Sequence, residues 1–165
     1  MLNEHCHNPL ESIEDVLYAK DWSFDRLSEE QLYFKVAGDR GTYRLLFIWD
    51  EMTKSLQFCC ELDIEVDADD IGNSYKLLSD VNSKLWLGHF DMVKESDRSS
   101  YTPCYRYTSL YFGGAPADSA AQMKELICYS LQESERLYDL FSLMSEPAHI
   151  PEKMSLALAE TAGRC

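Results

Sequence analysis

The sequence is poor in basic residues: 15 lysines and arginines stand against 29 aspartates and glutamates, which gives a formal net charge of −14 over 165 residues. A surface this negative repels the phosphate backbone of nucleic acids and anionic membranes. We therefore expect neither nucleic acid nor membrane as a partner. The charge favours a protein partner or client that presents a basic face.

Long apolar runs are also missing. The longest, Leu45–Trp49, is far shorter than the roughly 20 residues that span a bilayer. Residues 1–8 contain neither the basic nor the apolar region of a signal peptide. These absences predict a soluble, cytoplasmic protein, with residues 1–8 as a flexible tail.

The motifs of common cofactor and metal sites are absent as well. The six cysteines include no Cys-x-x-Cys pair, and in a cytoplasmic protein we expect them to be reduced thiols. Cys59 and Cys60 have no basic neighbour in sequence, and Glu61 follows them, which favours a raised thiol pKa. The segment Asp67–Gly72 begins like a calcium loop but lacks its later oxygen ligands. We predict no catalytic, cofactor-binding or metal-binding residues.

Two groups of residues have the types found in metal or catalytic sites, but neither is expected to form such a site. The run His5–His7 lies in the expected tail, where it forms no fixed metal site. His89 and Asp91 fall on one strand face, as a general base and its orienting carboxylate would. No serine or cysteine nucleophile accompanies them, so a polar outer strand face is the favoured interpretation.

The residues that are present suffice for a core, with 45% hydrophobic and 12% aromatic side chains. We expect one domain over residues 9–165. Alternating apolar and polar residues predict strands at 22–26, 31–37, 42–49, 56–66, 89–93 and 103–112. Caps and 3.6-residue spacing predict helices from Asn8 to about Lys20, from about Asp70 to Gly88, from Ser119 to Met144, and over 152–161.

This order, α-β-β-β-β-α-β-β-α-α, predicts an α+β fold in which helices pack on an antiparallel sheet. The strands at 31–37, 42–49 and 56–66 are joined by hairpin-length turns, so we expect them to be consecutive antiparallel neighbours. The residues expected in the core are Phe58, Cys60, Leu62, Ile64, Phe90, Leu126 and Phe141. Those expected in solvent are Gln57, Glu61, Asp63 and Glu65.

The strand at 42–49 is apolar on both faces, and the strand at 103–112 is rich in tyrosine. Helices on one side of a sheet cover only one face, and an apolar strip left in solvent usually marks a protein interface. Burial of this strip by the chain's own terminal helices is the alternative. The candidate interface residues are Leu46, Ile48, Tyr105, Tyr107 and Tyr111. A second subunit is the commonest cover for such a face, so we expect a homodimer.

Four strings carry a resemblance to a known family. They are Asn8-Pro-Leu-Glu11, Leu85-Trp-Leu-Gly-His-Phe-Asp91, Tyr105-Arg-Tyr-Thr-Ser-Leu110 with Gly113-Gly114, and Ala159-Glu-Thr-Ala-Gly163. The chain thereby resembles the YbjN family, also called bacterial sensory transduction regulators. The resemblance implies a fold similar to that of type III secretion chaperones, which are small acidic proteins that pair and bind segments of other proteins. It implies no catalytic residues.

The resulting hypothesis is a non-enzymatic protein-binding module, either chaperone-like or a regulatory adaptor of bacterial signalling or stress pathways. A small-molecule-sensing regulatory domain is the alternative, with Trp22, Trp49 and Trp86 lining an apolar pocket. An enzyme is the third reading and would need titratable groups clustered in a cleft.

Overall fold

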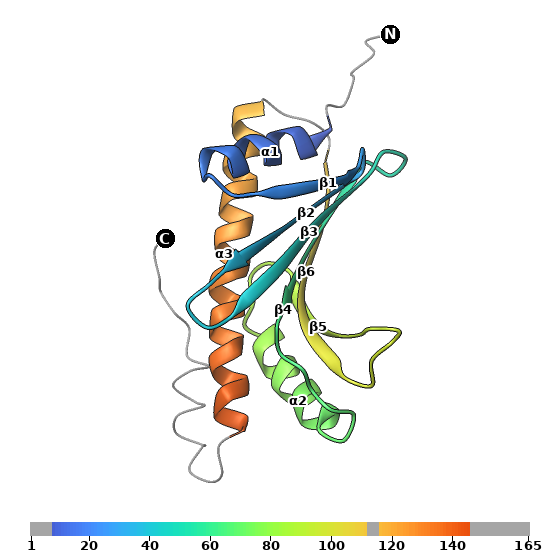
Figure 1. Ribbon diagram of the computed structural model, residues 1–165, viewed down its shortest axis with the longest axis vertical. Helices are drawn as coiled ribbons and strands as arrows, with labels where there is room; N and C mark the ends of the chain where they lie inside the picture. Colours follow the sequence, from blue (N-terminus) through green and yellow to red (C-terminus); the bar gives the residue numbers. More distant parts are fainter. Residues whose placement is uncertain (1–7, 112–115, 146–165) are drawn as a thin grey trace.

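A computed structural model describes residues 8–111 and 116–145 of the chain. This part contains three helices and six strands (Figure 1). In chain order they are α1 (Pro9–Ala19), β1 (Phe24–Ser28), β2 (Gln31–Ala37), β3 (Thr42–Asp50), β4 (Ser55–Leu62), α2 (Ile71–Asn82), β5 (His89–Lys94), β6 (Tyr101–Leu110) and α3 (Pro116–Met144). The predicted order is confirmed through α3. The predicted last helix at 152–161 and residues 1–7 of the predicted tail lie outside the described residues.

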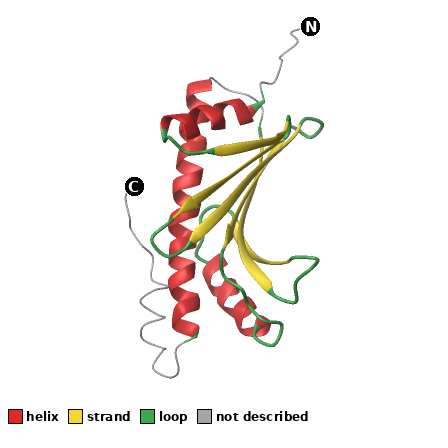
Figure 2. Cartoon of the chain, in the orientation of Figure 1, coloured by secondary structure: helices red, strands yellow, loops and turns green. Residues whose placement is uncertain are grey.

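The six strands form one antiparallel sheet in the order β1-β2-β3-β4-β6-β5 (Figure 2). Hairpins join the first four strands, and the Gly38 N–H donates to the Gly41 carbonyl at 2.8 Å in the β2–β3 turn. The predicted antiparallel neighbours are thus confirmed. The chain then crosses through α2 to β5 at the sheet edge, and β6 returns between β4 and β5.

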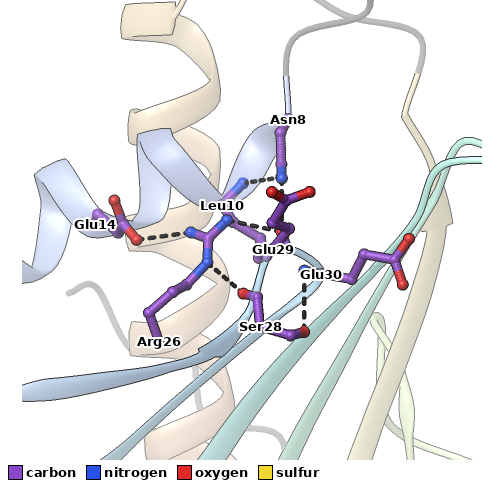
Figure 3. A network of polar contacts seen from close by, with 7 residues as sticks. All are labelled: Asn8, Leu10, Glu14, Arg26, Ser28, Glu29 and Glu30. Carbon is purple, nitrogen blue, oxygen red and sulfur yellow. Dashed lines mark hydrogen bonds and ion pairs between the residues drawn. The ribbon is translucent and has the colours of Figure 1, made fainter.

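The side chain of Asn8 caps α1 by accepting a hydrogen bond from the Leu10 N–H at 3.0 Å, as the sequence predicts. The same side chain donates to the Glu29 carbonyl at 2.9 Å. Arg26 in β1 donates to the Glu14 carboxylate at 2.6 Å and to the Glu29 carbonyl at 2.7 Å (Figure 3). This network fastens α1 to the turn between β1 and β2.

All three helices pack on the same face of the sheet, and their apolar side chains join one core with the inward side chains of the strands (Figure 1). The largest fully buried side chains are Trp49, Tyr43, Tyr105, Phe34, Phe47 and Phe58. Since side chains alternate along a strand, the opposite face holds the intervening residues. No helix of the described part covers that second face, which we call the open face.

The expected core residues are buried with one exception: Ile64 is only partly buried because β4 ends at Leu62 and not at Val66. Gln57, Asp63 and Glu65 are exposed as predicted. Glu61 is partly buried because it forms an ion pair with Arg44 on the open face.

The predicted end of the second helix was wrong. α2 stops at Asn82, whose side-chain oxygen accepts from the Phe90 N–H at 2.7 Å and whose amide donates to the Phe90 carbonyl at 2.9 Å. Gly88 instead directly precedes β5 and has a φ of +65°. A side chain there would collide with the Arg106 carbonyl, since a Cβ would lie 2.5 Å from its oxygen. This contact requires glycine.

Three other boundaries differ from the prediction. β1 begins at Phe24 instead of Trp22, and β6 spans Tyr101–Leu110. α3 begins at Pro116, so Ser119 lies inside the helix and does not cap it. The buried Ser119 hydroxyl is hydrogen-bonded to the Tyr111 hydroxyl instead.

Candidate functional site

One edge of β6 lacks a partner strand along part of its length. β4 pairs with β6 as far as Leu110, whereas β5 pairs only with residues from Tyr101 to Arg106. The Tyr111 N–H donates to the Lys54 carbonyl on the β4 side at 2.7 Å. Because backbone groups alternate in direction along an antiparallel strand, those of Thr108 and Leu110 face the other side. Within the described residues no strand meets them, and we call residues 107–110 the free edge of β6.

A groove of about 600 Å³ lies beside this free edge, between β6 and the first half of α3. Its lining is mostly aromatic and aliphatic. β6 and the residue after it contribute Tyr107, Leu110 and Tyr111, and α3 contributes Leu126 and Tyr129. The volume falls in the range of known binding pockets, and the apolar lining matches their usual character.

The loop between α2 and β5 closes one end of the groove. The Tyr105 hydroxyl donates to the Leu87 carbonyl at 2.8 Å, and the Trp86 N–H donates to the Tyr129 hydroxyl at 3.2 Å. These two bonds hold Leu87 in the groove wall. The side chain of Trp86 is 88% exposed, that of Leu87 44% and that of Leu110 on β6 63%.

Leu87 and Leu110 are thus exposed apolar residues of the groove lining, and exposed apolar surface is a common sign of an interaction site. The groove carries little charge of its own. Among the described residues that line it, Glu125 on α3 is the one charged side chain. Glu125 is exposed at the rim, on a chain whose net charge is −14.

Four of the five predicted interface residues divide between two surfaces, and the fifth lies in the core. Tyr107 is partly buried and Tyr111 is buried, and both line the groove. Tyr105 is fully buried in the core, so it presents no surface to a partner. Burial raises the pKa of its phenol. Leu46 and Ile48 lie on the open face, at the other side of the sheet.

The open face is partly apolar. Leu46 lies between Tyr33 and Cys59 across the strands, and Ile48 lies beside Gln57. Leu46 and Ile48 are partly buried by these neighbours. The face is therefore less exposed than the rim of the groove, although no described helix covers it.

Two thiols on the open face affect each other. The hydrogen bond to Cys104, followed by the nearby charge of Arg106, lowers the pKa of Cys59 to about 7, against the opposing effect of its burial. The prediction of a raised pKa for Cys59 was wrong because β6 brings the Cys104 thiol within hydrogen-bonding reach and also places Arg106 directly opposite Cys59. Burial raises the pKa of Cys60 to about 12, in agreement with its predicted place in the core.

Elsewhere in the described structure, the surface offers a further cleft whose charged residues are all acidic. A cleft of about 450 Å³ between the segment after β4 and the end of α3 is lined by acidic residues that include Asp63, Asp67 and Asp70. In the part of the chain that the structure describes, no three His, Cys, Asp or Glu side chains are grouped as metal ligands would be. None of the described helices combines the length and apolar character needed to cross a bilayer.

The three tryptophans do not line one pocket as the sensor hypothesis required. Trp49 is buried against Tyr111, with ring centroids 5.9 Å apart. Trp22 packs on Phe34 with centroids 6.1 Å apart, while Trp86 stands in solvent.

An open antiparallel sheet with every described helix on one face defines an α+β protein, with a second sheet face that no described helix covers and an apolar groove. The model of the YbjN family, described as "Putative bacterial sensory transduction regulator", matches residues 9–142. The chain therefore belongs to the YbjN family.

A solved structure supports the same fold. It is described as "Crystal structure of YbjN, a putative transcription regulator from E. coli" and is 13% identical in sequence. The comparison covers 90% of this chain and 87% of that chain, with a TM-score of 0.51. No curated protein matches the sequence.

Proposed function

We propose that this protein is a non-enzymatic protein-binding module that acts as a regulatory adaptor. The observation that carries the proposal is the apolar groove beside the free edge of β6, whose lining includes the exposed residues Leu87 and Leu110. Aromatic and aliphatic side chains of this kind are typical of the centres of protein interfaces. The family description, which names a regulator and no reaction, agrees with the proposal.

The groove favours a protein partner over a small molecule. Sites for small molecules usually surround most of the ligand surface. This groove is bounded by β6, α3 and the loop that carries Leu87, and it remains open along the free edge. A polypeptide uses such an edge, because its backbone can hydrogen-bond to it while its side chains enter the groove.

The test is affinity capture from a native cell extract with the full chain as bait, followed by mass spectrometry. The proteins found are then purified and titrated against this protein by calorimetry. We expect at least one partner to bind saturably at a fixed stoichiometry. If none of the purified candidates binds, the protein-binding function is refuted.

We also propose that the protein forms a homodimer through the open face, at Leu46 and Ile48. No described helix covers this partly apolar face, a second subunit can cover it, and two-fold pairing is the commonest form of such assembly. Two chains of −14 charge repel each other, but salt screens charges separated by more than about 8 Å at physiological ionic strength. A stable contact would bury more than about 1,000 Å².

Light scattering at tens of micromolar tests this assembly. We expect about twice the 19.0 kDa chain mass for the native protein. Ile48→Glu should give the monomer mass, whereas Tyr75→Glu, which alters an exposed residue of α2, should leave the dimer intact. A native mass of one chain would refute the dimer.

A further inference from the structure

We propose that the groove between β6 and α3 binds an extended, basic segment of a partner protein, which adds to the free edge of β6 as a seventh strand. The proposal rests on the protein-binding function above and assigns to it a site and a class of partner. The added strand would lie end to end with β5, beside the part of β6 beyond Arg106 that β5 does not pair with.

The backbone of β6 supplies the first part of the recognition. Thr108 and Leu110 each direct an N–H and a C=O toward the free edge, where the described chain provides no partner. An antiparallel strand of about four residues would satisfy these groups, since strands rise roughly 3.4 Å per residue. Backbone pairing of this kind provides affinity for extended peptides.

The groove supplies the second part. Alternate side chains of an added strand would point toward α3, into the space lined by Tyr107, Leu126 and Tyr129. Aliphatic residues at these alternate positions would be removed from water. The exposed side chain of Leu87, in the groove wall, would be covered at the same time.

Charge supplies the third part. Glu125 on α3 is the one charged residue among the described groove residues, so these residues present no positive charge to a basic segment. The net charge of −14 attracts a basic segment from a distance and repels an acidic one. An extended segment that alternates aliphatic and basic residues therefore fits the edge, the groove and the charge together.

The probe is a fluorescein-labelled eight-residue peptide that alternates valine and lysine, with binding to the full chain followed by fluorescence anisotropy. We expect saturable binding to the native protein. The same peptide with glutamate in place of lysine should bind at least tenfold more weakly. A peptide that carries N-methyl groups on the residues facing β6 should lose binding by a similar factor.

Thr108 provides a matched pair of protein variants. Thr108→Pro removes the N–H that faces the free edge, whereas the hydrogen bonds between β6 and β4 come from the intervening residues and remain. Thr108→Val keeps the N–H. We expect the dissociation constant to rise at least tenfold for Thr108→Pro and to change less than twofold for Thr108→Val. Should Thr108→Pro fail to fold, the N-methylated peptide tests the same bonds on the native protein.

Three outcomes would overturn the proposal. Equal affinity for the native protein and a folded Thr108→Pro variant would exclude strand addition. Displacement of the probe by a synthetic peptide of residues 146–165 would assign the groove to the chain's own segment. A purified partner that binds the native protein and Thr108→Pro equally would leave the protein-binding function standing and refute this site alone.

Discussion

Replacing Phe58 with alanine tests the arrangement of the two sheet faces. Phe58 lies in β4 at 0% exposure, with its ring centroid 4.6 Å from that of Phe47 and 6.2 Å from that of Tyr105. Removal of a buried phenylalanine side chain costs about 3–5 kcal/mol, because transfer energy is lost and a cavity remains. The two ring contacts place this site toward the upper half of that range, since each contributes about 0.5–1.5 kcal/mol beyond burial.

Gln57 is the matched control, because it precedes Phe58 in the same strand and points to the open face, where it is exposed. Gln57→Ala should change the free energy of unfolding by less than about 0.5 kcal/mol. Urea unfolding followed by circular dichroism measures both variants. With a slope near 2 kcal/mol per molar, Phe58→Ala should lower the midpoint by about 2 M. Similar losses for the two variants, or a larger loss for Gln57→Ala, would refute the assigned faces.

The remaining predictions concern local contacts. Gly88→Ala should destabilise the protein by about 1–3 kcal/mol because Gly88 has a positive φ and lies against the Arg106 carbonyl. Gly72→Ala, in open space on α2, should instead stabilise the protein by about 0.5–1 kcal/mol. A similar effect of both changes on thermal unfolding would contradict this reasoning. Alkylation of Cys59 by iodoacetamide should accelerate as pH rises through about 7, because the thiolate is the nucleophile. Cys104→Ala removes the hydrogen bond to Cys59 and should move that midpoint upward; unchanged pH profiles would show that the thiols do not interact. Asn82→Ala removes two hydrogen bonds to the Phe90 backbone and should lower the free energy of unfolding by about 1–3 kcal/mol in the same assay. An unchanged stability would contradict the role of these bonds at the C-terminal end of α2.

Much of the sheet could be predicted from sequence because its signals are local. A period of two and short turns determine β2, β3 and the buried face of β4. Asn8 and Pro9 likewise determine the start of α1, because each acts on the backbone of the first helical turn. The last turn of α2 was not predictable in this way. Apolar residues continue at helical spacing beyond Asn82, and the bonds that end the helix come from Phe90, which the sequence does not place beside it.

The candidate site was predicted only in part. The tyrosine content of β6 predicted the involvement of Tyr107 and Tyr111, but the other wall of the groove is formed by α3. The free edge exists because β6 inserts between β4 and β5 and extends beyond β5. Neither fact follows from local pattern. The apolar residue Leu87, in the loop directly before β5, was the sequence signal for this wall of the groove.

The free edge of β6 differs chemically from the outer edges of the sheet. Unpaired strand edges promote aggregation, and proteins usually protect them with charge, short strands or bulges. β1 has five residues, a bulge after Arg26 and a charged sequence, while β5 carries Asp91 and Lys94. Residues 107–110 are Tyr-Thr-Ser-Leu, with neither charge nor proline. An edge that must accept another strand cannot carry these protective features, and strand addition from a partner explains why this stretch lacks them.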